Sequence, residues 1–342
     1  MKSWTTLAPT WTIEACRACG GAALEAVLDL GVTPLADRLR TEAQLAQPEL
    51  VAPLSVAFCP ACTLVQIRET VAPEVLFRQD YPYYSSVSAQ LMAHFRESAE
   101  ALLARLPLGS GSLVIEAASN DGYLLRHFRR AGVPVLGVDP AQGPARAALE
   151  AGIPTLETFF TAELARSLRS EGHRATLFLA NNVLAHVADL NGFVEGIATL
   201  LTEDGLAVLE VPYLLDLVDH VEFDTIYHQH LCYFSVHALD RLFRRHGLWL
   251  THLERLRIHG GSLRLFVERR SRARPSVEAL LDLERRRGAD ERAFYDGFAA
   301  RVRALRSAIR GRLEAEKARG TTLVGYGAAA KACTLMSFCG ID

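Results

Sequence analysis

The stretch that constrains the fold most runs from Leu113 to Asp139 and reads LVIEAASNDGYLLRHFRRAGVPVLGVD. An apolar run ends in Glu116, and a turn of small residues follows as far as Gly122. Apolar residues at helical spacing come next, and a second apolar run ends in Asp139. The pattern predicts strand, turn, helix and strand, which is the βαβ unit of an open α/β sheet.

Ligands of such folds lie outside the carboxyl ends of the strands, and an acid that ends the second strand can accept two ribose hydroxyls. Asp139 therefore predicts an adenosine ligand. The turn lacks the three glycines of GxGxxG, and its Glu-x-x-x-Asn-Asp-Gly pattern resembles motif I of S-adenosylmethionine (SAM) methyltransferases. An acid there suits a ligand that carries a sulfonium and an ammonium. The alternative is an ordinary βαβ turn.

Length and composition bound the class of protein. The chain has 342 residues, 50% hydrophobic residues and a net charge of −2, so we expect two or three domains with real cores. No strongly basic surface is implied, and nucleic acid is not an expected partner. No apolar run reaches the length of a membrane helix, and the N-terminus carries no export signal. With seven cysteines, these features favour thiols and a metal over disulfides, and we expect a cytoplasmic protein.

Two CxxC pairs lie in the first sixty-odd residues. They place four thiolates, Cys16, Cys19, Cys59 and Cys62, at tetrahedral reach, which indicates zinc. The long spacer must carry strands of its own, with 24–30 and 54–58 as candidates. Four cysteines leave no open coordination position, so we expect a structural zinc and not a catalytic one. The alternative is four cysteines without a metal.

Two segments downstream carry polar side chains at predicted loop positions. The stretch DYPYYSS places Tyr81, Tyr83 and Tyr84 in a loop that Pro82 keeps turned or extended. It is either a packed aromatic loop or a polar edge over a substrate. Further on, the apolar strand 176–180 ends in two asparagines, and a helix is predicted from Val183.

The segment TIYHQH brings three titratable side chains and an amide together, namely Tyr227, His228, Gln229 and His230. The two histidines could bind a metal, but no third ligand lies nearby in sequence. A general base near neutral pH is the more economical role, with His186 as a possible neighbour. The alternative is that both histidines are structural.

The last third of the chain changes character. HGGSLRLFV predicts a glycine turn and a strand, in which Ser262 and Arg264 either touch an anionic substrate or belong to a hairpin, and the chemistry alone favours the hairpin. Residues 268–319 are charged with one apolar stripe at helical spacing, which predicts a long bridging helix. Residues 321–331 predict a new strand, glycine turn and helix, and with the chain ending at Asp342 we expect a partial third domain.

Together these motifs resemble the sugar C-methyltransferases of deoxysugar and antibiotic biosynthesis, which methylate nucleotide-linked 4-keto-6-deoxysugars at carbon. The matching segments are the CxxC pairs, CTLVQI, YPYYSS, EAASNDGYLL, NNVLAHVADL, TIYHQHLCYF, HGGSLR and GYGAAAKACTL. The resemblance implies an α/β fold: a Rossmann-like SAM methyltransferase domain (76–267) with a small N-terminal zinc-binding lobe (1–75) and a partial C-terminal α/β domain (268–342).

The resemblance also assigns residues. Those expected to bind SAM are Glu116, Ala118, Asn120, Gly122, Asp139, Asn181 and Asn182. The expected catalytic residues are His186, Tyr227, His228 and His230. The expected substrate-binding residues are Tyr81, Tyr83, Tyr84, Gln229, Ser262 and Arg264. The chain departs from the family twice, with Gln229 in place of a glutamate and Ala118 in place of a glycine.

The implied mechanism is proton removal by His230 from the carbon next to a ketone, with Tyr227 or His186 donating to the enolate oxygen, followed by attack on the SAM methyl. The implied partner is a nucleotide-sugar, bound by a monomer or homodimer. One competing hypothesis is an isomerase or epimerase of a keto sugar without methyl transfer. Two others are a nucleic-acid methyltransferase that reads through its zinc lobe and a non-catalytic partner protein.

Overall fold

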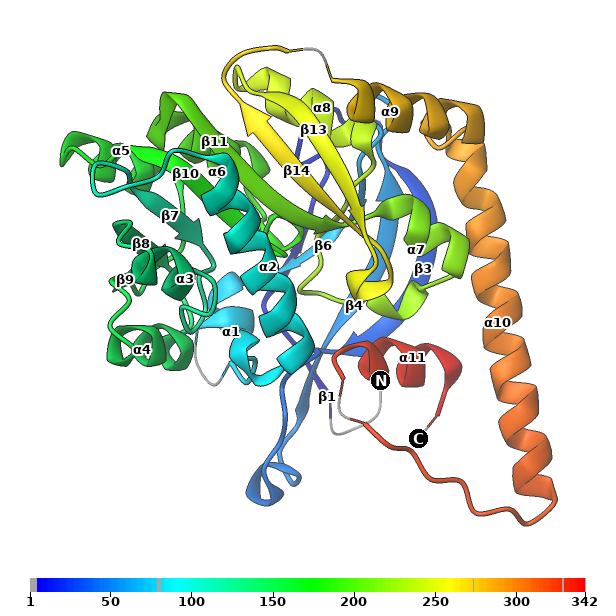
Figure 1. The fold of residues 1–342 in the computed structure, drawn as a ribbon. Helices are drawn as coiled ribbons and strands as arrows, with labels where there is room; N and C mark the ends of the chain where they lie inside the picture. The colour runs from blue at the N-terminus through cyan, green and yellow to red at the C-terminus, as the bar shows by residue number, and fades with distance from the viewer. Residues whose placement is uncertain (1–4, 79–80, 273, 328, 342) are drawn as a thin grey trace.

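The computed structural model describes residues 5–78, 81–272, 274–327 and 329–341. Asp80 and Ala328, which belong to two of the predicted motifs, lie outside the described residues. A seven-stranded sheet forms the centre of the molecule, in the order β13-β14-β11-β10-β7-β8-β9 (Figure 1). Its strands are β7 (Val114–Ala117), β8 (Val135–Val138), β9 (Thr155–Leu156), β10 (Ala175–Asn181), β11 (Leu201–Pro212), β13 (Trp249–Leu256) and β14 (Ser262–Glu268).

Five neighbouring strands of this sheet are parallel, namely β11, β10, β7, β8 and β9. The other two, β13 and β14, form an antiparallel hairpin at one edge. The hairpin alternative for the HGGSLRLFV segment is thus confirmed. Glu116 of β7 pairs with Leu179 of β10 and with Gly137 of β8, so the carboxyl ends of these three strands lie at one edge. That register brings the turn after β7, Asp139 and Asn181 together.

Both faces of the sheet are covered by helices, as the continuous apolar strands require. The sheet has a hydrophobic core on each face. Successive side chains of β7 point to opposite faces, so that Val114 packs in one core and Ile115 in the other. The helices on the first face are α2 (Ala89–Arg105), α3 (Leu125–Arg130) and α4 (Gln142–Glu150). Those on the second are α5 (Ala162–Ser170), α6 (Leu190–Leu200) and α8 (Val236–Arg245). The expected helix from Val183 is wrong, since a 3-10 turn, η3 (Leu184–His186), precedes α6.

The N-terminal lobe is built on a second, five-stranded sheet, and the expected strands in the cysteine spacer are confirmed. The strands are β1 (Thr5–Leu7), β3 (Glu25–Pro34), β4 (Glu49–Phe58), β5 (Val65–Ile67) and β12 (Cys232–Tyr233), with β2 (Thr10–Thr12) and β6 (Glu69–Val71) forming a separate pair. β12 comes from the middle of the chain and pairs antiparallel with β5. The lobe therefore shares a sheet with the rest of the molecule.

The bridging segment forms two helices, α9 (Pro275–Arg287) and α10 (Arg292–Ala318), because Gly288 ends the first in a left-handed conformation with φ of 67°. α10 runs along one edge of the molecule (Figure 1). The helix α11 (Lys331–Cys339) forms as expected and packs on η4 (Phe223–Thr225), with ring centroids of Phe223 and Phe338 5.4 Å apart. The expected strand over 321–326 is wrong: these residues form no regular structure, and Tyr326 is fully exposed.

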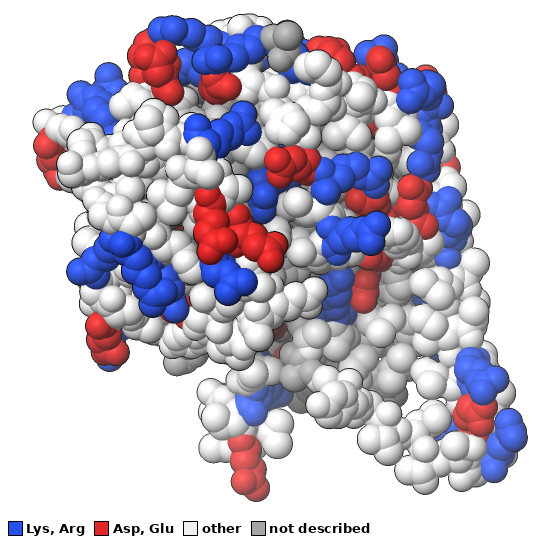
Figure 2. Space-filling view, in the orientation of Figure 1, with Lys and Arg blue, Asp and Glu red and all other residues white. Residues whose placement is uncertain are grey.

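The surface carries both signs of charge. In Figure 2, basic and acidic side chains are interspersed over the face shown, in keeping with a net charge of −2. Among the described residues, the helices include none with the length and apolar character needed to cross a membrane.

Candidate active site and zinc centre

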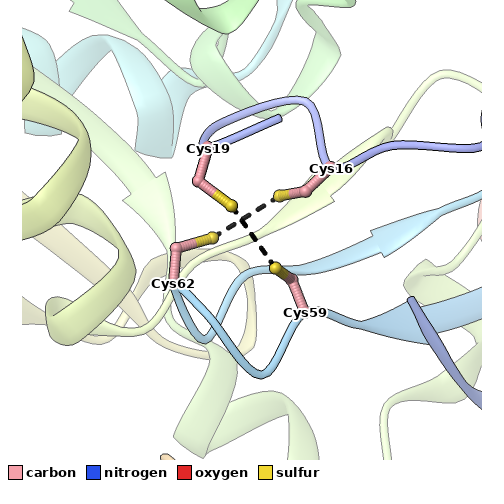
Figure 3. A group of neighbouring side chains, drawn as sticks. All are labelled: Cys16, Cys19, Cys59 and Cys62. Carbon is pink, nitrogen blue, oxygen red and sulfur yellow. Dashed lines mark hydrogen bonds between the residues drawn. The ribbon is translucent and has the colours of Figure 1, made fainter. Parts of the chain in front are cut away.

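The four cysteines converge in the N-terminal lobe (Figure 3). Their sulfur atoms all lie within 4.8 Å of one another, and the Sγ–Sγ distance is 3.5 Å for both Cys16–Cys62 and Cys19–Cys59. Zn–S bonds of about 2.3 Å place tetrahedral sulfurs at nearly this spacing. The hydrogen bond from Cys62 lowers the pKa of Cys16 to about 4, whereas burial raises the pKa of Cys59 to about 11, so one thiol of the cluster ionises readily and the others would need the cation itself to favour the thiolate.

Each pair lies on a tight turn closed by backbone hydrogen bonds. Gly20 N donates to Cys16 O, and Thr63 N donates to Cys59 O, at 2.9 and 2.8 Å. Both Gly20 and Thr63 adopt left-handed conformations, with φ of 74° and 66°. The turns point the thiols inward, and four protein ligands leave no open position, so the centre is structural.

The turn after β7 contains three residues in the left-handed backbone conformation, which non-glycine residues rarely adopt. Ala118, Asn120 and Gly122 have φ of 56°, 49° and 72°. A Cβ at Gly122 would lie 2.8 Å from the Cγ1 atom of Ile153, which explains the glycine. Asp139 stabilises the turn by accepting a 2.8 Å hydrogen bond from Asn120 N.

Asp139 lies where sequence predicted the ribose acceptor. Its second oxygen accepts from Ala141 N at 2.8 Å, and the side chain is buried. Burial raises the pKa of Asp139 to about 6, and the two backbone donors limit the rise. The carboxylate is fixed by two backbone amides and keeps lone pairs for further donors.

Several buried polar atoms around this turn have no hydrogen-bond partner among the described residues. They are both carboxylate oxygens of Glu116, Oγ of Ser119, Oδ1 of Asp121 and Oδ1 of Asn182. Burial raises the pKa of Glu116 well above its ordinary value. Unpaired buried polar atoms are costly, and a cluster of them at the carboxyl edge of a sheet indicates a ligand site. Asp121 and Ser119 were not singled out from the sequence, although Asp121 follows Asn120 in the same motif.

The tyrosine loop lies over this turn. The side chain of Asn120 accepts from Ser85 N at 2.9 Å and donates to Tyr83 O at 3.1 Å. The ring of Tyr81 lies 6.4 Å from that of Tyr83, and burial raises the pKa of Tyr81. Tyr84 reaches the start of α4, where a Cβ at Gly143 would lie 2.5 Å from its Oη atom. The loop therefore borders the expected ligand site.

Two histidines and a tyrosine meet beside it. The Oη atom of Tyr227 lies 3.0 Å from Nε2 of His230, and the rings of His186 and His230 are 4.9 Å apart. His230 Nδ1 donates to Thr225 O at 2.7 Å, and His186 Nδ1 donates to Gln229 O at the same distance. Because a carbonyl only accepts, both rings carry their proton on Nδ1 and present Nε2 as an acceptor, which in His230 receives the hydroxyl of Tyr227.

Burial also sets the charge of this group. It lowers the pKa of His186 to about 4 and that of His230 well below its ordinary value, the neighbouring His186 adding to the second effect. Burial raises the pKa of Tyr227. The group is therefore neutral near pH 7, with an imidazole base next to a phenol that keeps its proton. Phe77, which the sequence did not mark, packs its ring on those of both His186 and Tyr81, at 5.6 and 5.9 Å.

Other predicted residues have protein partners. His228 Nε2 donates to Pro53 O at 2.9 Å, and Gln229 Nε2 lies 3.5 Å from Ala36 O, so both side chains face the N-terminal lobe. Ser262 is buried and donates to Ile258 O at 3.2 Å. Arg264 pairs with Glu210 at 2.7 Å.

Comparison with known proteins matches three family models along the chain. They are a zinc binding domain at residues 16–77, a methyltransferase domain at 92–253 and a C-methyltransferase C-terminal domain at 257–342. The chain is 36% identical over 332 residues to C-methyltransferase NovU of Streptomyces niveus, an alignment that covers 96% of this chain and 79% of NovU. The chain belongs to the family of SAM-dependent C-methyltransferases.

Two other similarities are more limited. A ubiquinone biosynthesis O-methyltransferase of Bartonella tribocorum shares 31% identity with this C-methyltransferase over 94 residues, which cover 27% of this chain and 38% of that protein. The solved structure of magnesium protoporphyrin IX methyltransferase from Synechocystis with bound SAH aligns at 18% identity and a TM-score of 0.43, over 52% of this chain and 83% of that one.

The residues present fit the cofactors of a SAM-dependent C-methyltransferase. SAM carries a cationic sulfonium and ammonium. Both oxygens of Glu116 and Oδ1 of Asp121, which are buried and without a hydrogen-bond partner among the residues described, are acceptors for such a ligand. The four-cysteine cluster fits the structural zinc of the N-terminal domain. The expected fold class, a Rossmann-like sheet with a zinc-binding lobe, is confirmed.

Proposed function

We propose that this C-methyltransferase acts on a nucleotide-linked 4-keto-6-deoxysugar, at a carbon next to the ketone. The observation that carries the proposal is the 3.0 Å contact between Tyr227 Oη and His230 Nε2, because it pairs a base with a proton donor. His186 joins them from η3, five residues beyond Asn181, the last residue of β10. The group thus lies next to the proposed SAM-binding turn.

His230 is the proposed base. A ketone acidifies the neighbouring C–H bond, and that proton passes to Nε2 of His230, which the Thr225 carbonyl keeps in the required tautomer. Burial lowers the pKa of His230, so the imidazole is neutral and ready to accept at neutral pH. The carbon–hydrogen electron pair moves toward the ketone oxygen as the proton leaves.

Tyr227 is the better of the two proposed donors to that oxygen. The one ring proton of neutral His186 is bound to Gln229 O, whereas the hydroxyl of Tyr227 can turn from His230 toward a substrate. A raised pKa keeps the phenol protonated, so it acts as donor and not as base. His186 then shapes the site and holds no proton for the reaction.

The proposed SAM-binding set is Glu116, Ala118, Asn120, Gly122, Asp139, Asn181 and Asn182, to which we add Asp121. SAM supplies the electrophilic methyl group. Tyr81, Tyr83 and Tyr84 remain proposed substrate contacts. We leave His228, Gln229, Ser262 and Arg264 out of the reacting groups because their side chains have protein partners. The domain limits, the cytoplasmic location and the oligomeric state stay predictions.

The test is incubation with SAM and a panel of nucleotide 4-ketosugars, with the matching 4-hydroxy sugars as substrate controls and mass as the readout. A ketosugar should gain one CH₂ and a hydroxy sugar none. His230→Ala should lower turnover by about 10²–10⁴ with SAM affinity retained. His220→Ala, at a histidine whose side chain is 57% exposed, is the matched control and should leave turnover unchanged.

The outcomes separate the alternatives. Exchange of the substrate C–H proton without mass gain would favour an isomerase or epimerase and contradict the proposal. Unchanged turnover in His230→Ala would remove that residue from the mechanism. No gain of mass on any ketosugar would overturn the substrate class while leaving the family assignment intact.

A further inference from the structure

The loop that carries the proposed base presents its side chains in two directions. Tyr227 and His230 contact each other, whereas His228 and Gln229 between them face the N-terminal lobe. His228 donates to Pro53 O of β4 at 2.9 Å. The lobe therefore contacts the loop on the side opposite to the one where Tyr227 and His230 meet.

The strand that follows the loop is also held by the lobe. Cys232 and Tyr233 of β12 pair with Gln66 and Val65 of β5. Ile67 N donates to Leu231 O at 3.0 Å. The loop thus ends in a short strand whose sheet partner belongs to the zinc-binding lobe.

The side chain of Gln66 connects that strand pair to the cysteine cluster. It is fully buried, its Nε2 donates to Cys16 Sγ at 3.2 Å, and its Oε1 accepts from Arg17 N at 3.1 Å. A neutral amide can donate to a thiolate and accept from a backbone N–H at once, which a carboxylate cannot do. Polar groups next to metal ligands orient them and tune their affinity for the metal.

We propose that Gln66 is a positioning residue that couples the zinc centre to the catalytic loop 227–230. The proposal rests on the proposed role of His230. Zinc fixes Cys16, the thiolate fixes the Gln66 side chain, and Gln66 sets the register of β5 against β12. His230 lies two residues before that strand, and its carbonyl accepts from Tyr233 Oη at 2.9 Å. Zinc binding thereby influences the position of the His230 imidazole through the shared sheet.

The test compares Gln66→Met, which keeps the shape and loses both hydrogen bonds, with Ser55→Ala in β4. Ser55 donates to Glu69 Oε1 at 2.7 Å within the same lobe and touches no cysteine. Gln66→Met should weaken zinc binding by about 10–100-fold, and it should release zinc to a chelator faster than the wild type. With zinc saturating, amides 231–233 should exchange hydrogen faster, while those of β7 stay protected. Ser55→Ala should match the wild type in both.

If amides 231–233 of zinc-saturated Gln66→Met exchange hydrogen at the wild-type rate, the coupling is overturned. A wild-type rate of zinc release in this variant would also overturn it. Should that variant fail to fold, chelation of the wild-type protein decides: zinc removal should speed exchange at 231–233 before it does at 114–117, and the reverse order contradicts the proposal. None of these measurements needs a sugar, so they are independent of the substrate proposal. Once turnover is measured, zinc-saturated Gln66→Met should lower kcat with the KM for SAM unchanged, and an unchanged kcat would contradict the coupling.

Discussion

Glu116 is a buried acid whose protonation should report cofactor binding. Neither oxygen has a hydrogen bond of normal geometry within the described part of the chain, and burial raises the pKa of Glu116 well above its ordinary value, although the nearby Tyr123 side chain lowers it. A cationic ligand favours the carboxylate, so its binding lowers that pKa and releases a proton to solvent. Above the pKa of about 6 for Asp139, calorimetry in buffers of different ionisation enthalpy should therefore show proton release on SAM binding.

Glu116→Gln removes the titrating group and keeps the shape. In this variant the binding enthalpy should no longer depend on the buffer, and SAM affinity should fall. A wild-type enthalpy that is the same in every buffer would contradict a protonated Glu116.

The pH profile of turnover should follow His230. Burial lowers the pKa of His230 well below its ordinary value, and the neutral form is the base. The rate is therefore lost as pH falls through the lowered pKa and is constant above it. We expect no inflection in kcat at or above about pH 6.5, the ordinary histidine value. An acid limb centred there would show that the imidazole is more exposed to water than its burial indicates.

Residue types and spacings predicted the four-cysteine cluster, the position of Asp139 directly after a central strand and the convergence of His186, Tyr227 and His230. They did not predict which way His228 and Gln229 point. In a loop without regular period, side-chain direction depends on tertiary partners, here the carbonyls of Pro53 in β4 and of Ala36 in the turn after β3. Every residue has a backbone carbonyl, so the sequence does not indicate which one will accept a hydrogen bond from a distant side chain.

At the scale of elements, one buried acid joins two helices. Glu284 of α9 is fully buried and accepts from Tyr213 Oη, Val236 N, His237 N and His237 Nδ1 at 2.7–3.1 Å. It therefore caps the N-terminus of α8 from a different helix. Glu284→Ala leaves these donors unpaired and should cost about 3–5 kcal/mol of unfolding free energy in urea.

Glu278→Ala on the same helix is the matched control. Its side chain is 52% exposed, and its partner Arg274 keeps a second ion pair with Asp240, so the loss of Glu278 should change stability by less than about 0.5 kcal/mol. Equal effects of the two variants would mean that Glu284 is not the link between α8 and α9.

The elements that periodicity predicted best are those that need no distant partner. The βαβ unit formed as expected because its apolar runs are buried on both faces. Residues 321–326 have the composition of a strand, but a strand needs a neighbour to bond, and none pairs with them among the described residues. Composition shows what a segment can form, and the fold decides whether it does.

For the whole molecule, the shared sheet makes the zinc-binding lobe part of one cooperative unit. β5 of the lobe pairs with β12, and Asn191 of α6 donates to Arg17 O and Ala18 O beside the first cysteine turn, at 2.9 and 3.1 Å. The CxxC spacing predicted the metal, but not that a strand from residues 232–233 would complete its sheet. β12 is only two residues long, too short to show the alternation of a strand in the sequence, and its partner β5 lies far away along the chain.

Unfolding should therefore release zinc and destroy the central sheet together. In urea, the midpoint for zinc release, followed with a coloured indicator, should coincide with the midpoint for loss of far-ultraviolet circular dichroism. Cys59→Ser, which removes one ligand, should lower both midpoints equally, because the metal stabilises only the folded state. A zinc-release midpoint lower by about 1 M urea or more than the other would mean that the lobe unfolds alone, and that β12 does not hold the two parts as one unit.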